Sequence, residues 1–165
     1  LLSSRVGAGQ LSQEMVDFAA LVRTETDDRR AQGSHVDLSA DEATRGVIVL
    51  GDRLALRRIV ANILDNAIKY GRVARLRLQL ENPAIVLTVD DEGPGIPPDR
   101  RQAMLEPFNR LETSRNRATG GAGLGLAVAR SLVEAHDGTI GLAEAPGGGM
   151  RVRIGLPVFR PDAWR

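Results

Sequence analysis

The clearest pattern of hydrophobic and polar positions lies between residues 52 and 70. Hydrophobic residues recur there at three- and four-residue steps, which predicts an amphipathic helix, and Asp52 is placed to cap its first turn. The positions predicted to face the core are Leu56, Ile59, Val60, Ile63, Leu64, Ala67 and Ile68. The remaining arc, about 100° wide, is polar, and it holds Arg58, Asn62, Asp65, Asn66 and Lys69.

Similar patterns predict the other elements of the chain. Helices are expected over about 11–30, 99–106 and 122–136. Short or alternating hydrophobic segments predict strands at 36–38, 47–50, 73–80, 85–89, 139–143 and 150–156. Turns are expected at Asn82-Pro83 and Gly147-Gly148-Gly149. This order predicts an α+β fold, a two-layer sandwich with helices packed on one face of a mixed sheet.

Composition and charge exclude several classes of function. A chain of 165 residues is expected to form one domain. Its net charge of +1 gives no general attraction to nucleic acid or to an anionic membrane surface, and it has no basic stripe with interleaved aromatics. The absence of cysteine excludes disulfides and thiol nucleophiles. No hydrophobic run approaches the roughly 18 residues of a membrane span.

Two asparagines distinguish the polar arc of the predicted helix from an ordinary solvated surface. Asn62 and Asn66 are one turn apart, and Lys69 continues the same stripe. An amide oxygen is a ligand that Mg²⁺ accepts beside substrate phosphates, and a lysine supplies a point charge for a phosphate. A simple polar surface remains the alternative at this point.

Two glycine-rich loops add further candidate chemistry. Asp91 precedes Gly93 and Gly95, so a carboxylate that can accept a hydrogen bond from an amine such as that of adenine stands beside a tight turn. The second loop, residues 120–126, leads directly into a predicted helix, where backbone amides can bind a phosphate chain. It matches neither the dinucleotide fingerprint nor the P-loop. An acidic turn and a flexible hinge are the respective alternatives.

The motifs together resemble those of sensor histidine kinases. Residues 62–70 (NILDNAIKY) resemble the N box, 91–96 (DEGPGI) the first glycine box, 106–110 (EPFNR) the F box and 121–126 (GAGLGL) the second glycine box. His136-Asp137-Gly138 and Gly147-Gly148-Gly149 also match the C-terminal pattern of the family. The resemblance extends from about Leu11 to Val158 and implies the Bergerat ATP-binding fold.

The resemblance also implies ATP and Mg²⁺ as cofactors and assigns roles to individual residues. Asn66 is expected to coordinate the metal, and Asn62 and Lys69 to contact the phosphates or the metal shell. Arg110 is expected to approach the γ-phosphate. Asp91 is expected to bind the adenine amine in a pocket shaped by Gly93 and Gly95, and Tyr70 and Ile96 to line the nucleotide site. The ATP lid is expected over residues 111–121. The residues expected to close it and to offer amides to the phosphates are Gly121, Gly123, Leu124 and Gly125.

The nucleophile that the family uses, a histidine on a dimerisation and phosphotransfer domain, is not recognisable in this chain. His35 lies in a polar connection, and His136 is followed by Gly138, a pattern typical of a helix end. We therefore expect residues 1–9 to be a linker or the end of the phosphotransfer helix, 10–158 the catalytic domain and 159–165 a tail. The expected partners are that domain of the same protein and, indirectly, a response regulator. The resemblance implies a cytoplasmic location in an often membrane-anchored receptor, with no membrane contact by this segment.

Three alternatives remain beside histidine phosphorylation. ATPases of the same superfamily place a general-base glutamate one turn before the metal asparagine, where this chain has Asn62, which cannot abstract a proton. A serine kinase of the anti-sigma-factor type is a second alternative. A non-catalytic ATP-sensing module is the third, although such a module would be expected to lose Asn66, Asp91 or a lid glycine.

Overall fold

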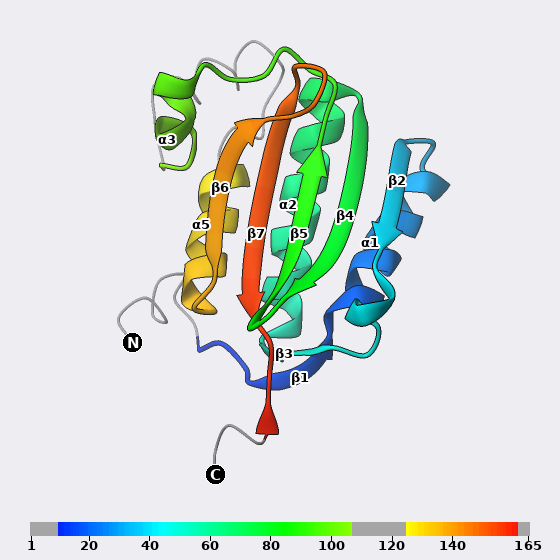
Figure 1. Ribbon diagram of the computed structural model, residues 1–165, viewed down its shortest axis with the longest axis vertical. Helices are drawn as coiled ribbons and strands as arrows, with labels where there is room; N and C mark the ends of the chain where they lie inside the picture. The colour runs from blue at the N-terminus through cyan, green and yellow to red at the C-terminus, as the bar shows by residue number, and fades with distance from the viewer. Residues whose placement is uncertain (1–9, 107–124, 162–165) are drawn as a thin grey trace.

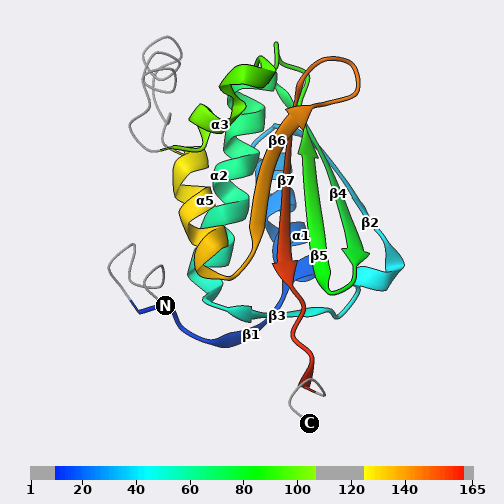
Figure 2. The ribbon, with the colours of Figure 1, turned by 60° about the vertical axis from the view of Figure 1, so that its left-hand side comes forward.

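The computed structural model describes residues 10–106 and 125–161, which form two layers, a twisted sheet and a layer of helices (Figures 1 and 2). The strands are β1 (Glu14–Asp17), β2 (His35–Ala40), β3 (Ile48–Gly51), β4 (Val73–Glu81), β5 (Ala84–Asp90), β6 (Thr139–Glu144) and β7 (Met150–Pro157). The α-helices are α1 (Phe18–Ala31), α2 (Arg53–Gly71), α3 (Arg101–Met104) and α5 (Gly125–Ala135), and the 3₁₀ turns are η2 (Glu42–Thr44) and η3 (Pro98–Arg100).

The main sheet has five strands in the order β2-β4-β5-β7-β6. β2 runs parallel to β4, whereas the other neighbours are antiparallel, so the sheet is mixed. Helices α1, α2 and α5 lie on one face of it (Figure 2). The predicted α+β two-layer architecture is therefore confirmed.

α2 is the central helix of the second layer, and the predicted pattern explains its position. The side chain of Asp52 accepts a hydrogen bond from the backbone amide of Ala55, which caps the first turn as expected. Of the seven residues predicted to face the core, six are buried, and Ile68 is partly buried against the same cluster. The opposite wall of the core comes from alternate residues of the strands, for example Val152, Ile154 and Leu156 of β7. This packing directs the polar side of α2 away from the sheet.

The N-terminal helix begins later than predicted. Residues 14–17 form β1, which pairs antiparallel with β3 in a separate two-stranded sheet, and α1 begins only at Phe18. Asp17 caps it, because its carboxylate accepts a hydrogen bond from the amide of Ala20. The three- and four-residue spacing of Met15, Phe18 and Val22 does not reveal this change, because a strand residue at 15 and helix residues after it give the same intervals.

The end of α5 also differs from the expected cap. The residue in the left-handed conformation is Asp137, with a φ of 61°, rather than Gly138. The glycine is required for a different reason, since a Cβ on Gly138 would lie 2.5 Å from the carbonyl oxygen of Gly155 in β7. The helix expected over residues 99–106 is also shorter than predicted, because only η3 and α3 form there.

Candidate nucleotide-binding site

Asp91 is the most buried and most fully hydrogen-bonded side chain among the predicted site residues that the structure describes. It follows β5 directly and is only 4% exposed. Its Oδ1 accepts hydrogen bonds from two backbone amides, that of Gly93 at 2.9 Å and that of Met150 at 2.9 Å. Its own amide donates to the carbonyl of Met150 at 3.0 Å. The carboxylate is therefore held from two sides by backbone groups.

The loop after Asp91 needs glycine at both predicted positions. A Cβ on Gly93 would lie 2.6 Å from the carbonyl oxygen of Tyr70 at the end of α2. Gly95 has a φ of 76°, and a Cβ there would lie 2.8 Å from the carbonyl oxygen of Gly148. Ile96 is partly buried and packs against the core cluster. The loop is thus pressed between the end of α2 and the turn that joins β6 to β7.

The asparagines of α2 are half-buried rather than part of a solvated face. Asn62 donates a hydrogen bond through Nδ2 to the carbonyl oxygen of Gly125, the first residue of α5, at 3.2 Å. The Nδ2 of Asn66 is buried and has no hydrogen-bond partner among the described residues. A buried amide nitrogen without a partner is costly, so this donor indicates an acceptor that comes from outside the described residues.

The structure divides the polar arc that the sequence suggested for α2. Asp65 does not join the asparagines, because its carboxylate accepts a hydrogen bond at 3.1 Å from Arg29 of α1. Lys69 is exposed and Tyr70 half-buried in the last turn of the helix. Asp65 therefore belongs to the contact between α1 and α2, and Asn62 lies against α5.

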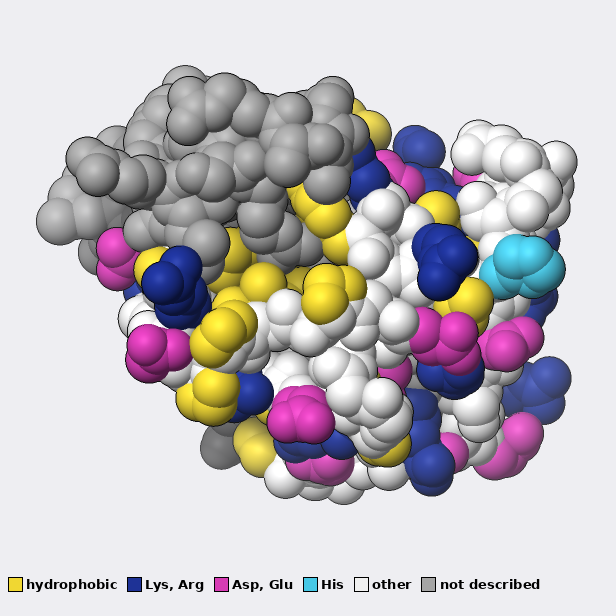
Figure 3. Space-filling model, turned by 90° about the horizontal axis from the view of Figure 1, so that it is seen from above, with side chains coloured by type: hydrophobic (Ala, Val, Ile, Leu, Met, Phe, Trp, Pro, Cys, Tyr) yellow, Lys and Arg dark blue, Asp and Glu magenta, His cyan; other side chains and the backbone are white. Residues whose placement is uncertain are grey.

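Hydrophobic side chains gather on the surface at the end of the sheet where β5 terminates and β7 begins (Figure 3). Four of the predicted site residues lie outside the described part of the chain, namely Arg110, Gly121, Gly123 and Leu124. The same holds for most of the predicted F box and for the predicted lid. Their proposed roles therefore rest on the sequence.

His136 is a structural residue, as its sequence context suggested. It is 8% exposed, its Nε2 accepts a hydrogen bond from the backbone amide of Asp52 at 3.1 Å, and its Nδ1 lies 2.7 Å from the carbonyl oxygen of Leu132. A neutral imidazole with the proton on Nδ1 satisfies both contacts. The ring joins the end of α5 to the beginning of α2.

Sequence reasoning did not identify Met150 and Gly71 as parts of the site. Met150 contributes a backbone amide, which no side-chain pattern reveals. Gly71, the last residue of α2, has its Cα hydrogens against the side chain of Asp91. The signal in the sequence for this contact is the Gly147-Gly148-Gly149 run before Met150, which predicted a turn but not its place in the site.

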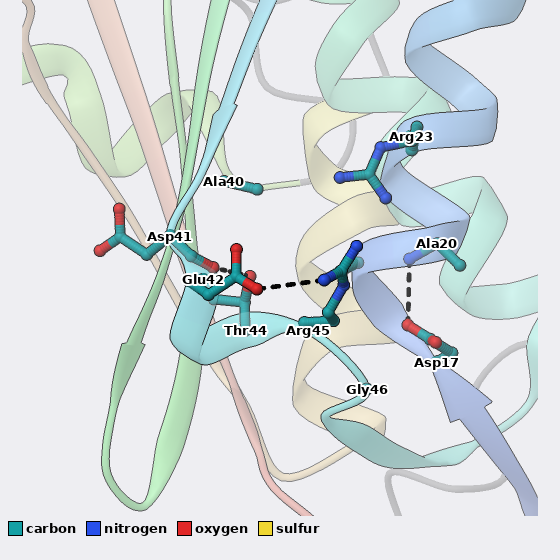
Figure 4. Close-up of a pocket in the computed structure, with 10 residues that line it drawn as sticks. Asp17, Ala20, Arg23, Ala40, Asp41, Glu42, Thr44, Arg45 and Gly46 are labelled. Atoms are coloured by element: carbon teal, nitrogen blue, oxygen red, sulfur yellow. Dashed lines mark hydrogen bonds and ion pairs between the residues drawn. The ribbon is translucent and has the colours of Figure 1, made fainter.

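A cavity of about 210 Å³ lies elsewhere, between the first turns of α1 and the connection from β2 to β3 (Figure 4). None of the predicted site residues lines it. Four of its charged groups already have partners, because Arg45 pairs with Glu42 at 3.1 Å, Asp41 pairs with Arg77 at 3.5 Å and Asp17 caps α1. This cavity is separate from the candidate nucleotide site.

The chain belongs to the family of histidine kinase-, DNA gyrase B- and HSP90-like ATPases, whose match covers residues 51–160. This range contains α2, the loop after Asp91 and the β6–β7 turn, so the family assignment and the geometry concern the same segment.

Similar proteins are sensor histidine kinases. The chain is 37% identical over 158 residues to the sensor histidine kinase TmoS of Ectopseudomonas mendocina. This aligned region covers 92% of this chain and 16% of TmoS. It is 31% identical over 161 residues to the sensor histidine kinase CpxA of Escherichia coli strain K12, covering 97% of this chain and 34% of CpxA. The chain thus spans only a minor part of these relatives.

Among solved structures, full-length ShkA in complex with AMPPNP has a similar fold, with a TM-score of 0.75 and 27% sequence identity. The match covers 94% of this chain and 34% of the ShkA chain. Within the described residues, no helix is both long and apolar enough to cross a membrane.

Proposed function

We propose that the chain binds Mg-ATP at the end of the sheet where β5 terminates and supplies its γ-phosphate to a histidine in another domain of the full-length protein. The observation that carries the proposal is the buried carboxylate of Asp91, held by two backbone amides beside a glycine loop. The similarity to sensor histidine kinases supports the choice of acceptor.

Asp91 has the properties needed to select adenine. Both amides that hold the carboxylate donate to Oδ1, so Oδ2 is the oxygen left for a ligand. An ionised carboxylate only accepts hydrogen bonds. It therefore favours the exocyclic amine of adenine and disfavours the carbonyl oxygen that hypoxanthine and guanine carry in its place. Gly93, Gly95 and Ile96 are the residues proposed to form the surrounding pocket.

The residues of α2 fit a metal that is brought in with the phosphates. The described residues contain no group of three or more His, Asp and Glu side chains that could hold a metal ion by itself. They offer instead the amides of Asn66 and, one turn earlier, Asn62. The unpartnered Nδ2 of Asn66 is a donor that suits a phosphate oxygen, and its Oδ1 is the atom that could coordinate a metal. Neutral amide oxygens suit Mg²⁺ that keeps phosphate oxygens as its other ligands. Asn66 and Asn62 would hold such a metal, and it would supply positive charge to offset that of the phosphates.

Lys69 and the residues outside the described ranges complete the proposed phosphate site. Lys69 is exposed one turn beyond Asn66 on α2, where its ammonium group can contact a phosphate. Tyr70 lines the nucleotide, and Arg110 approaches the γ-phosphate. Gly121, Gly123, Leu124 and Gly125 form the closing lid. Phosphoryl transfer depends mainly on such alignment and charge neutralisation.

Transfer to a protein acceptor is favoured over hydrolysis, because the residues near Asn66 and Asp91 offer no evident general base that could activate water. The position one turn before Asn66 is Asn62, whose amide cannot take a proton from water. Glu92, which follows Asp91, forms an ion pair with Arg75 on β4. Asn62 cannot act as a general base and Glu92 is engaged with Arg75, and on this ground the acceptor is proposed to lie outside this domain.

The proposed partner is the dimerisation and phosphotransfer domain of the same protein, followed by a response regulator. The match covers only 16% of TmoS and 34% of CpxA, so these relatives contain further segments, which supports a partner domain in the same protein. The catalytic domain is proposed to work in the cytoplasm.

Titration with ADP and with an ATP analogue, each with and without Mg²⁺, tests the proposal. Asp91→Asn presents a donor where the carboxylate accepted, so ADP affinity should fall at least about tenfold with or without metal. Asn66→Ala should mainly abolish the increase in affinity that Mg²⁺ produces. Asp90→Asn is the matched control, because Asp90 pairs with Arg151 and takes no part in the proposed site. Equal affinities of the parent, Asp91→Asn and Asn66→Ala would contradict the proposed roles.

A further inference from the structure

The turn between β6 and β7 lies directly against Asp91. A Cβ on Gly149 would lie 1.9 Å from the backbone carbonyl oxygen of Asp91 and 2.7 Å from its Oδ1. The first of these separations is far inside van der Waals contact, and the atom concerned belongs to the backbone. Glycine is therefore required at position 149 by the place that Asp91 occupies.

The same turn also binds Asp91 through hydrogen bonds. The amide of Met150 donates to Oδ1 of Asp91, and the carbonyl of Met150 accepts from the amide of Asp91. The turn is itself well defined, because the amide of Ala145 donates to the carbonyl of Gly149 at 2.7 Å and the amide of Gly148 donates to the carbonyl of Ala145 at 2.9 Å. One short hairpin thus sets both the backbone and the carboxylate of Asp91.

We propose that Gly149 and the backbone amide of Met150 are positioning residues that aim the free oxygen of Asp91 and thereby set the preference for adenine. This inference rests on the proposed function of Asp91. It adds that the preference depends on a turn 58 and 59 positions further along the chain, outside the loop that carries the carboxylate.

The physical basis is the tolerance of a hydrogen bond for misalignment. Binding groups lose their effect when they move by more than about 0.5 Å or 10–20° from the productive geometry. Oδ1 of Asp91 has two donors from different segments, Gly93 in its own loop and Met150 in the turn. With only the donor from its own loop, the carboxylate can rotate, and Oδ2 loses a fixed direction.

The main experiment compares ADP with inosine diphosphate, both without metal, on the 165-residue chain. Inosine diphosphate differs at the exocyclic position that Asp91 is proposed to read. We expect Gly149→Ala to reduce ADP affinity at least about tenfold while the affinity for inosine diphosphate changes little, so the ratio of the two falls. Gly141→Ala is the matched control, because Gly141 lies in β6 of the same hairpin and a Cβ there meets nothing within 4 Å. It should keep the ratio of the parent.

A second variant removes the donor of Met150, in case Gly149→Ala does not fold; it also weakens the carbonyl of Gly149, which accepts from Ala145, as an acceptor. Replacing Met150 by its α-hydroxy acid analogue exchanges the amide for an ester and leaves every side chain in place. We expect the ADP preference to fall about three- to tenfold, since one charge-assisted donor is lost. A folded variant of either kind that keeps the ratio of the parent overturns the inference. A parent chain with no preference for ADP over inosine diphosphate overturns the proposed function of Asp91 instead.

Discussion

Glu25 offers a quantitative test of how α1 and α2 are held together. Its side chain is 4% exposed, and its two oxygens accept hydrogen bonds from Arg29 at 2.9 Å and from Arg57 of α2 at 3.2 Å. Arg29 is itself only 13% exposed and also contacts Asp65 of α2. The perturbation is Glu25→Gln, which keeps the shape of the side chain and removes its charge.

The expected loss follows from the two contacts. A hydrogen bond to a charged group contributes about 1.5–3 kcal/mol, and glutamine can keep one of the two through its remaining oxygen. Arg57 is half-exposed and can turn to water, so its share is small. Arg29 keeps its contact with Asp65. The loss in free energy of unfolding is therefore smaller than the value for a fully broken buried ion pair, which is about 3–5 kcal/mol. We expect about 2 kcal/mol, or about 4–8 °C in the midpoint of thermal unfolding for a chain of this size.

Urea unfolding and calorimetry of the nucleotide-free chain measure this loss. The control is Glu42→Gln, because Glu42 pairs with Arg45 on the surface and both side chains are more than four-fifths exposed. It should change the free energy of unfolding by at most about 0.5 kcal/mol. If Glu25→Gln is as stable as Glu42→Gln, the buried pairs do not hold the two helices together.

Two further predictions concern the cap of α2 and the histidines. The pKa of Asp52 is lowered by hydrogen bonds from the backbone amides of Ser12 and Ala55. The carboxylate of Asp52 therefore makes its full contribution to the free energy of unfolding above about pH 3.9, its pKa in the unfolded chain. This contribution is lost as the pH falls through the lower pKa of the folded state. Asp52→Ala should cost about 1 kcal/mol in urea unfolding at pH 7 and less at pH 3, and an equal cost at both would refute the reasoning. With γ-labelled ATP and Mg²⁺, His136 should remain unlabelled, since both of its ring nitrogens are engaged; a label on His136 that is stable to base but lost in acid would contradict this.

The local elements were largely predictable from sequence. The hydrophobic spacing between residues 52 and 70, with Asp52 before it, predicted α2 to within one residue at each end. The alternation in β7 predicted its buried and exposed faces for the same reason, since neighbouring residues of a strand point to opposite sides. The strand β1 was missed, because its formation depends on pairing with β3, more than 30 residues later.

The candidate site was predictable only in its residue types. The motif around Asp91 identified the carboxylate and its glycines, and the asparagine stripe identified one face of α2. The helical wheel placed Asp65 on the same face, but its carboxylate accepts a hydrogen bond from Arg29 of α1 instead of joining the asparagines. A helical wheel gives the direction of a side chain around its own helix, but it contains no information on which neighbour stands there.

What the sequence by itself determined is thus the set of local elements, their buried faces and the chemical groups available for nucleotide binding. Only the tertiary structure decided which of those groups meet. The amide of Met150 reaches Asp91 across 59 residues, and Asn62 reaches Gly125 across 63. The physical reason is that periodicity and capping are properties of neighbouring residues, whereas these contacts depend on the register of strands and the packing of helices over the whole chain.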